Sequence, residues 1–588
     1  MGLMQRAIET YDNNVKRIGV YSEGGEPLAP IGHILTRADI EITLNREGGF
    51  LSARRRDKSE PKILIPVTEE SGGRSGTKAN ERPHPLCDAL KYYAAEENYF
   101  LPQLSKWINS DYSHPFLQVI YDYLSKNKIR DDLSGTVGTP NDDDFICWRV
   151  NGIPEENPEC WKNINLFNAF VSYYCDSISG RNASVCMVSG DTAPTALQHP
   201  KGIISINGNA KLISANDSSG FTYRGRFMDS EQACTVGYAA SQKAHNAIRW
   251  LAAEQGVREI TGNRVFICWN PQGTRIPKPM RRLRGADAEP IYVPSDYKKD
   301  LQKSLYSYRQ SADLRDTDCV VTAAFDAATT GRLSLAYYNE ISAGIFLDRL
   351  YEWEEHCCWY NGKFGIQSPN LLQIVDCAFG TQRGSFVETD DRVQRQHLQR
   401  LLDCKVNGGV FPADIVQCLA NRASSPLNYD ETIWRKTLFT ACAAIQKYNF
   451  DTKKGGNEMA WELDKKDRSF QYGRLLAAME RAEEDYYRKT QESRQTNAIK
   501  FMSEFRQRPF YVFERVNRSL NQAYLNRIEE WQAKRYERIV GEIFAILREF
   551  PESDLNKPLD NIYLMGYELQ RNAFFTKSEI INNNETEE

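Results

Sequence analysis

The sequence changes character at a polar stretch, DTKKGGNEM, which covers residues 451 to 459. Before it, segments with strand-like and helix-like periodicity alternate, whereas nearly every later segment has the period of a helix. Apolar residues of the tail recur at steps of three and four and form one stripe, which comprises Tyr536, Ile539, Val540, Ile543, Phe544 and Leu547. Such a stripe is typical of a helix that packs in a bundle. We therefore expect the chain to end in an all-helical bundle.

The part before this stretch mixes strands and helices. Alternating or continuous apolar residues predict strands at 38 to 44, 145 to 150 and 265 to 269, and a long helix is predicted from Glu231 to Ala253 with Ser230 as its N-cap. The predicted fold class is α+β, a mixed α/β amino-terminal body followed by the helical bundle. The expected regions are 1–180 with a glycine-rich loop, 181–340 with a second polar loop, a helical or mixed region at 341–455, and the bundle at 456–588.

The overall charge excludes a strongly cationic protein. Across 588 residues, 74 Lys and Arg stand against 78 Asp and Glu, which gives a formal net charge of -4. Any surface that binds nucleic acid must therefore be a local basic patch.

The cysteines and the hydropathy pattern indicate a cytoplasmic protein. The 14 cysteines contain no CxxC pair, which favours reduced thiols over disulfides or a zinc ribbon. The amino terminus lacks the apolar core of a signal peptide, and no run of about eighteen apolar residues predicts a membrane span.

A glycine-rich stretch, PVTEESGGRSGTKANERPHPL, covers residues 66 to 86 between an apolar strand and helix-like sequence. Glycines let the backbone approach a ligand closely, and the basic residues of the stretch supply positive charge. GxxxxGK[ST] is absent, so this is not a Walker A loop. Two interpretations remain, contact with a nucleic acid or nucleotide, or a mobile surface loop.

Two further segments are locally basic. GTRIPKPMRRLRG, residues 273 to 285, contains five cations and no acidic residue, namely Arg275, Lys278, Arg281, Arg282 and Arg284. Residues 486 to 540 hold twelve Lys and Arg against six Asp and Glu. Either segment is a candidate for contact with phosphates, and a solvated charged face is the alternative for both.

The sequence offers no catalytic constellation. The seven histidines include no HExxH or HD pair, and His84, His114 and His199 each precede proline, which favours turns over metal ligands. Residues 142 to 144, three consecutive aspartates, are either a metal site or a solvated turn. We predict no catalytic residue, no bound metal and no cofactor.

Five stretches together resemble one protein family, the large subunit of the subtype I-C CRISPR Cascade complex, also called the Csd family. They are PVTEESGGRSGTKANERPHPLCDAL (66 to 90), CMVSGDTAPTALQHPKGI (186 to 203), LISANDSSGFTYRG (212 to 225), LAYYNEISAGIFLDRLYEWEE (335 to 355) and YLMGYELQRNAFF (563 to 575). They follow one another along nearly the whole chain.

The resemblance implies a non-catalytic subunit of an RNA-guided antiviral assembly. Such a subunit recognises the protospacer-adjacent motif (PAM) in double-stranded DNA, helps unwind it, stabilises the R-loop and recruits a helicase-nuclease. The implied partners are target duplex DNA, guide RNA (crRNA) within the complex, and the backbone, crRNA-end-capping and small helical subunits. An internal start at Met459 would produce such a small subunit from the same gene.

Within this family the glycine-rich stretch is the candidate for reading the motif, because a narrow loop of small residues can enter a minor groove. The predicted DNA contacts there are Ser71, Gly72, Gly73, Arg74, Ser75, Gly76, Lys78 and Asn80. The second polar loop, residues 207 to 216, adds Asn209, Lys211, Ser214 and Asn216. The cations of residues 273 to 285 are predicted to contact the DNA backbone. The alternatives are a scaffold subunit without direct DNA readout and a metal-dependent nuclease built on residues 142 to 144.

Overall fold

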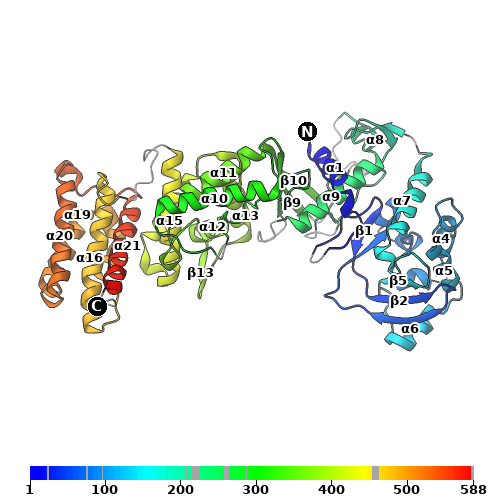
Figure 1. Ribbon diagram of the computed structural model, residues 1–588, viewed down its shortest axis with the longest axis horizontal. Helices are drawn as coiled ribbons and strands as arrows, with labels where there is room; N and C mark the ends of the chain where they lie inside the picture. Colours follow the sequence, from blue (N-terminus) through cyan, green and yellow to red (C-terminus); the bar gives the residue numbers. More distant parts are fainter. Residues whose placement is uncertain are drawn as a thin grey trace. The chain divides into compact units, whose positions relative to one another are not determined.

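The computed structural model describes residues 1–22, 25–74, 77–95, 97–181, 183–204, 209–214, 226–228, 230–256, 264–285, 288–329, 331–452 and 462–584. Two compact units divide the chain: unit 1 comprises Met1–Ile276 and Cys319–Ile341, and unit 2 comprises Pro277–Asp318 and Ser342–Glu588. Figure 1 shows mixed strands and helices in the amino-terminal part and helices in the carboxy-terminal part, which confirms the predicted α+β class.

Unit 1 contains short helices and several small sheets. Its helices are α1 (Leu3–Asn13), α2 (Glu69–Gly73), α3 (Leu90–Tyr93), α4 (Phe100–Ile108), α5 (Pro115–Leu124), α6 (Ile129–Val137), α7 (Ile164–Ile178), α8 (Ser230–Ala233) and α9 (Tyr238–Glu254). Its strands are β1 (His33–Thr36), β2 (Ile40–Asn45), β3 (Phe50–Arg55), β4 (Ile63–Pro66), β5 (Ile146–Asn151), β6 (Ala183–Val185), β7 (Thr192–Pro194), β8 (Arg264–Trp269), β9 (Cys319–Thr329) and β10 (Arg332–Ser342). The 3-10 helices are η1 (Val15–Arg17), η2 (Thr77–Glu81) and η3 (Cys160–Lys162).

The first core of unit 1 surrounds the sheet β3-β2-β5. Strand β2 pairs antiparallel with β3 and parallel with β5, with Ile40 opposite Ile146. Helices α4, α5 and α7 contribute Trp107, Phe116 and Phe170 to the same apolar cluster. Strand β4, which leads into the glycine-rich stretch, pairs antiparallel with β1 and is buried along its whole length. The start of that stretch is thus attached to the core.

The second core of unit 1 is built on the sheet β10-β9-β8. Strands β8 and β9 are antiparallel, and helices α1 and α9 contribute Ala7, Ile248 and Leu251 to the apolar cluster that includes this sheet. Helix α9 therefore has a fixed position, and it carries polar residues that face the amino-terminal strands. One of them, Asn246, donates through its Nδ2 atom to the carbonyl oxygen of Pro30 at 2.9 Å.

Unit 2 is largely helical. Its helices are α10 (Pro294–Ala312), α11 (Ala343–His356), α12 (Leu371–Phe379), α13 (Asp391–Asp403), α14 (Ala413–Ala423), α15 (Glu431–Asp451), α16 (Arg468–Thr490), α17 (Asn497–Lys500), α18 (Met502–Gln507), α19 (Pro509–Ala523), α20 (Glu530–Leu547) and α21 (Tyr563–Asn584). Its strands form the hairpins β11 (Trp359–Tyr360) with β12 (Ile366–Gln367) and β13 (Thr381–Arg383) with β14 (Phe386–Glu388). Shorter helical turns are η4 (Gly362–Phe364), the π-helix η5 (Cys404–Gly408), η6 (Pro426–Asn428), η7 (Leu525–Arg527) and η8 (Glu552–Asp554).

The expected helical tail is present in unit 2. Helix α20 buries Tyr536, Ile539, Ile543 and Leu547, which confirms the apolar stripe. Helix α15 ends at Asp451, the first residue of the polar boundary stretch, and α16 begins after the stretch. Residues 453 to 461, including Met459, lie outside the described residues.

The long helix predicted from Glu231 to Ala253 is interrupted. Ser230 begins the short helix α8, and the long helix α9 begins only at Tyr238, after Gly237. The intervening backbone pairs elsewhere: the Met187 N–H donates to the Thr235 carbonyl at 2.8 Å, and the Ala196 N–H donates to the Val236 carbonyl at 2.9 Å. Pairing with the segment around β6 and β7 thus replaces the helical hydrogen bonds at this point.

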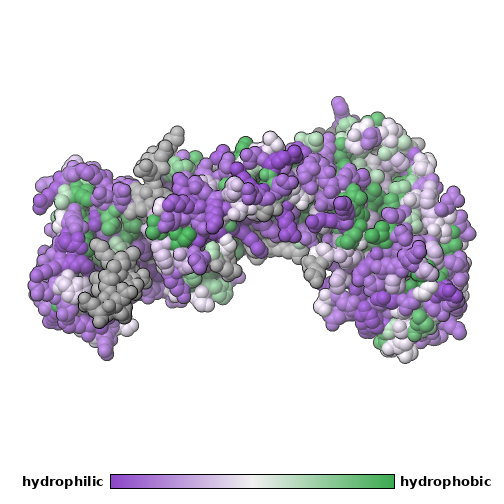
Figure 2. Space-filling view, viewed as in Figure 1, coloured by the Kyte–Doolittle hydropathy of each residue, from purple (hydrophilic) through white to green (hydrophobic). Residues whose placement is uncertain are grey.

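Figure 2 shows hydrophilic side chains over most of the visible face, with smaller hydrophobic areas between them. Among the described residues, no helix combines the length and the apolar character that a membrane crossing requires.

Candidate nucleic-acid interface

The glycine-rich stretch begins with a capped helical turn, where a loop was expected. The Ser71 N–H donates to Thr68 Oγ1 at 3.1 Å, and the Thr68 N–H donates to Ser71 Oγ at 3.0 Å, so the two residues cap the helix α2 reciprocally. We call residues 68 to 74 the glycine turn. Ser71 itself is buried, and its hydroxyl lies 2.9 Å from His84 Nδ1. Its side chain is therefore directed into the protein.

Arg74 closes the glycine turn onto the core. Its NH1 and NH2 atoms donate to the two carboxylate oxygens of Asp88 at 2.6 and 2.7 Å. Asp88 has an exposed fraction of 0% and also accepts from the N–H groups of His84 and Ala89. The Arg74 guanidinium lies over the ring of Tyr92 at 4.2 Å from its centroid. These contacts fix the position of Arg74 relative to Asp88 and Tyr92.

A cavity of about 240 Å³ opens beside the glycine turn. We call it the turn pocket. Its lining combines backbone of the turn with polar side chains, which include Gly72, Gly73, Gln198, Lys201, Gln242 and Arg249. A Cβ atom on Gly73 would overlap the side-chain amide of Gln198, whereas a Cβ atom on Gly72 would meet only Val67, at 3.9 Å. A side chain at position 73 would therefore displace the flexible end of Gln198, whereas one at position 72 would meet only Val67.

The two predicted DNA-contacting loops meet at this pocket through Lys201. Its backbone forms an antiparallel bridge with Lys211 of the second loop, and the Gly202 N–H donates to the Ala210 carbonyl at 3.0 Å. The Lys201 ammonium lies 3.5 Å from the Arg74 carbonyl oxygen. Asn209 and Ser214, on either side of Lys211, are exposed. The structure therefore joins segments that are more than a hundred residues apart in the sequence.

Burial and neighbouring positive charges lower the pKa values of the two lysines near the turn pocket. Burial and Arg74 lower the pKa of Lys201, and burial and Lys201 lower the pKa of Lys211. Burial lowers the pKa of Arg249 to about 10, and the charge of Glu26 opposes this shift. Burial, with a smaller contribution from Lys211, lowers the pKa of His199 to about 4, so this histidine adds no charge at neutral pH.

Lys201 and Arg249 were missed by sequence reasoning. Lys201 follows a His-Pro pair just before the second loop, and that proximity was the only signal of its position. Arg249 lies inside the helical periodicity of α9, where an arginine is ordinarily a solvated surface residue. Only the tertiary packing of α9, which contacts α1 and β8 and bonds through Asn246 to Pro30, brings it to the pocket.

The remaining predicted contacts of the first two loops have different positions. Asn80 is exposed at the end of the glycine-rich stretch, in the 3-10 helix η2 that also contains the backbone of Lys78. Ser75, Gly76 and Asn216 lie outside the described residues. The predicted role of these residues in DNA binding stays a prediction.

The basic stretch from 273 to 285 is divided between the units. Arg275 is exposed in unit 1, whereas Lys278 and Arg281 are exposed in unit 2. Arg282 donates to Gln367 Oε1 at 3.0 Å. Arg284 is buried, donates to Asp300 Oδ2 at 2.7 Å and lies over the Tyr297 ring, so its guanidinium stabilises the fold of unit 2.

Each of the three consecutive aspartates forms an ion pair with a different basic side chain. Asp142 pairs with Arg130 at 2.6 Å, Asp143 with Lys91 at 2.6 Å and Asp144 with Arg55 at 3.2 Å. Within the described ranges, no group of three or more His, Cys, Asp or Glu side chains is arranged to hold a metal ion.

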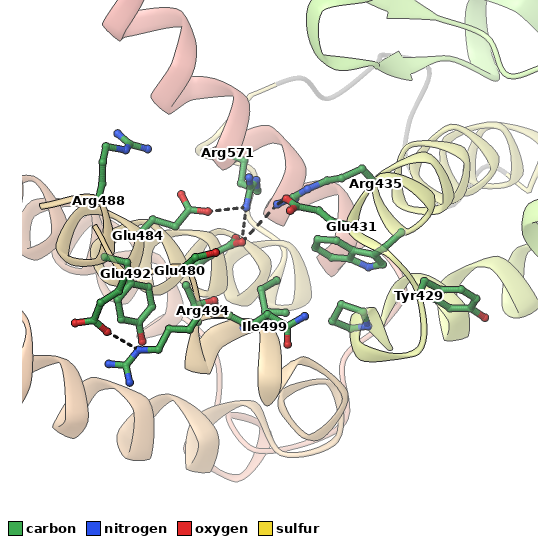
Figure 3. A pocket seen from close by; sticks show the side chains of 16 residues that line it. Tyr429, Glu431, Arg435, Glu480, Glu484, Arg488, Glu492, Arg494, Ile499 and Arg571 are labelled. Atoms are coloured by element: carbon green, nitrogen blue, oxygen red, sulfur yellow. Dashed lines mark hydrogen bonds and ion pairs between the residues drawn. The ribbon is translucent and has the colours of Figure 1, made fainter. Parts of the chain in front are cut away.

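A larger cavity of about 580 Å³ lies in unit 2, among α15, α16 and α21. Figure 3 shows Arg435 and Arg571 directed towards Glu480 and Arg494 directed towards Glu492, whereas Arg488 points away from these groups. Each lining arginine has a carboxylate partner, in the pairs Arg435–Glu480 at 3.6 Å, Arg571–Glu480 at 2.5 Å, Arg494–Glu492 at 3.0 Å and Arg488–Asp485 at 4.0 Å. This cavity is therefore close to charge balance, unlike the turn pocket.

Comparison with known proteins identifies the family. The chain matches the family model of the CRISPR-associated protein Cas_Csd1 over residues 8–575, which is nearly its whole length. No curated protein matches the chain by sequence. The match includes the glycine turn, the second loop and most of the helical tail. The chain therefore belongs to the Csd1 family of CRISPR-associated proteins and is a large subunit of a type I-C Cascade complex.

Proposed function

We propose that this Cascade subunit recognises the PAM in target duplex DNA through the surface formed by the glycine turn and the second loop. It then begins strand separation, stabilises the R-loop and recruits a helicase-nuclease, and it does not itself hydrolyse DNA. Guide RNA reads most of the target by base pairing, so the protein needs to recognise only a short duplex segment.

The observation that carries this proposal is the meeting of the two predicted loops at Lys201. Gly72 and Gly73 place half-buried backbone at the turn pocket, and Asn209 and Ser214 add exposed polar side chains a short way along the chain from Lys211. Small and polar groups suit the narrow minor groove, where base readout is coarse. Positive charge from Lys201 and Lys211 favours the adjacent phosphates.

In this proposal the predicted residues divide into two roles. Asn209, Lys211 and Ser214 contact DNA, together with the backbone at Gly72 and Gly73. Ser71 and Arg74 act through their contacts with His84 and Asp88, which maintain the shape of the turn.

The test uses the assembled complex and a library of duplexes in which a randomised short motif flanks a matched target. We expect wild-type complex to enrich a subset of motifs, and the double variant Asn209→Ala/Ser214→Ala to lose most of that enrichment. Ser52→Ala, which removes an exposed hydroxyl from β3, is the matched control. Unchanged enrichment in the double variant would refute the assignment of the motif-reading surface.

The alternative from another class is a scaffold subunit that binds only its protein neighbours. A mobility-shift assay of the isolated chain with duplex DNA separates the two, because a scaffold leaves the duplex unshifted. Metal-dependent cleavage of DNA by the purified chain would instead support a nuclease.

A further inference from the structure

We propose that the turn pocket is a binding site for one phosphate group of the DNA backbone, held by Lys201 and Arg249. The inference rests on the proposed function, because it requires a duplex to lie against the glycine turn. It adds a site that reads no sequence and sets the position of the duplex relative to the motif-reading loops.

Both cations have hydrogen-bond donors to spare. A lysine ammonium has three N–H donors, and that of Lys201 makes one long contact, to the Arg74 carbonyl oxygen at 3.5 Å. A guanidinium has five donors, and that of Arg249 uses Nη1 for Asn246 Oδ1 at 3.0 Å and Nη2 for the Lys201 carbonyl oxygen at 3.2 Å. Neither cation forms an ion pair with any residue that the structure describes.

The nearby carboxylates are already neutralised by other groups. Glu69 lines the pocket, but its Oε2 atom accepts from Arg181 and its Oε1 atom accepts from the N–H groups of Leu197 and Gln198, at 2.8 and 3.1 Å. Asp88 is committed to Arg74. Glu26 partly offsets the burial of Arg249, but its Oε1 atom already pairs with the Lys62 ammonium at 2.6 Å. Among the described residues, no carboxylate therefore forms an ion pair with Lys201 or Arg249.

Partly buried cations of this kind are costly unless an anion neutralises them. The lowered pKa of Arg249, about 10, expresses that cost, because burial there disfavours the charged form. The cavity of unit 2 provides the comparison, since each of its arginines faces a carboxylate of the chain itself. The missing counter-charge at the turn pocket is the feature that points to an external anion.

The size and place of the pocket favour a phosphate group of nucleic acid. Its volume of about 240 Å³ is below that of cavities that enclose drug-sized ligands, which start at about 300 Å³, and it accommodates a small anionic group with water. Gly72 and Gly73 form one wall, so an anion in the pocket lies beside the exposed backbone of the turn. Lys211 extends the positive surface towards the second loop.

The test measures binding of the assembled complex to a short motif-bearing duplex at several salt concentrations. We expect Lys201→Ala to weaken binding about tenfold and to reduce the slope of log affinity against log salt by about 0.9, the value for one lost phosphate contact. Enrichment of motifs from the randomised library should keep the wild-type ranking. Lys201→Arg should restore most of the affinity, because it returns a charged donor to the pocket.

Lys106→Ala is the matched control, since it removes an exposed lysine of α4 without an ion pair among the described residues. Arg249→Lys keeps the charge while changing the donor geometry and should weaken binding less than Lys201→Ala. A second measurement, the thermal stability of the purified chain with and without millimolar inorganic phosphate, reports on the pocket without DNA.

The outcomes separate the two proposals. Wild-type affinity and salt slope in Lys201→Ala, combined with lost motif enrichment in Asn209→Ala/Ser214→Ala, would overturn the phosphate site and leave the proposed function standing. Stabilisation by inorganic phosphate that needs Lys201, without any effect on duplex binding, would assign the pocket to a free anion and also overturn it. Failure of Lys201→Ala to assemble into the complex, with Lys201→Arg assembling normally, would assign the pocket to an acidic side chain of a partner subunit.

Discussion

Arg74 and Asp88 form an ion pair of two parallel hydrogen bonds, 2.6 and 2.7 Å long, that fastens the glycine turn to the buried segment that follows the glycine-rich stretch. The pair connects the segment where DNA contact is proposed to the core of unit 1. A change at Arg74 therefore acts on the shape of the turn before it acts on any ligand.

We predict that Arg74→Ala lowers the free energy of unfolding of unit 1 by about 3 kcal/mol, because it leaves the carboxylate of Asp88 buried without its partner. Arg74→Lys should lose less, since it keeps the charge but not the two-point geometry. Calorimetric unfolding of the purified chain provides the measurement. Arg46→Ala, which breaks an exposed pair with Glu47, should leave the transition unchanged. Equal melting of the Arg74→Ala variant and the wild type would contradict the prediction.

The second prediction concerns the glycine at the wall of the turn pocket. Gly73→Ala should displace the side-chain amide of Gln198 and weaken duplex binding by the complex, whereas Gly72→Ala should have little effect, because its new Cβ atom meets only Val67 at 3.9 Å. The double variant Gly73→Ala/Gln198→Ala removes the overlap and should recover part of the lost affinity. Equal affinities for all three variants would show that the overlap has no consequence for binding.

The third prediction uses the contact between α16 and α21. A Cβ atom on Gly473 would overlap the Tyr563 carbonyl, and one on Gly566 would overlap the Phe470 carbonyl, so both glycines allow the helix backbones to touch. Gly473→Ala must separate the helices and should destabilise the bundle by about 1 to 3 kcal/mol. Gly541→Ala in α20, where nothing lies within 4 Å of the new Cβ atom, should stabilise it by up to about 1 kcal/mol through helix propensity.

Urea unfolding of the full chain, followed by the helical circular-dichroism signal, measures the effects of Gly473→Ala and Gly541→Ala. The two substitutions change the sequence identically and differ only in their surroundings. Shifts of the same sign for both would contradict the proposed close approach of α16 and α21.

The fourth prediction concerns Glu483, whose side chain is fully buried in the bundle and accepts from the Asn497 N–H at 2.5 Å. Burial raises its pKa to about 7; the charge of Glu480 adds to this, while hydrogen bonds from the backbone at residues 497 and 498 and the charge of Lys500 oppose it. Between about pH 4.5 and 7 the folded chain keeps this proton and the unfolded chain has released it. Its contribution to stability therefore decreases as pH rises through that window.

We accordingly expect Glu483→Gln, which cannot ionise, to gain stability relative to the wild type as pH increases from 5 to 8. The measurement is the urea midpoint of both proteins at each pH. Glu530→Gln, at an exposed position of α20, is the control and should keep a constant difference from the wild type. A constant difference for Glu483→Gln as well would show that Glu483 has an ordinary pKa in the folded protein.

The sequence by itself determined the helices and strands whose buried residues recur at a short, regular spacing along the chain. The stripe on α20, the alternation in β2 and the helical tail could be predicted because every residue of such a pattern contacts the same core. The glycine-rich stretch was recognised as a candidate site for the same reason, since its composition is local. These patterns could be predicted because they depend only on residues that are close together in the sequence.

Tertiary structure alone decided the rest. Sequence periodicity missed the capped helix α2 and the break before α9, because partners from distant segments, such as Asp88 for Arg74 and Met187 for Thr235, take the hydrogen bonds there. The turn pocket likewise needs Gly73, Lys201 and Arg249 to meet, and no local pattern records which distant segments will share a cavity. Charge at that site depends on which acids are already paired, and only the folded chain settles that pairing.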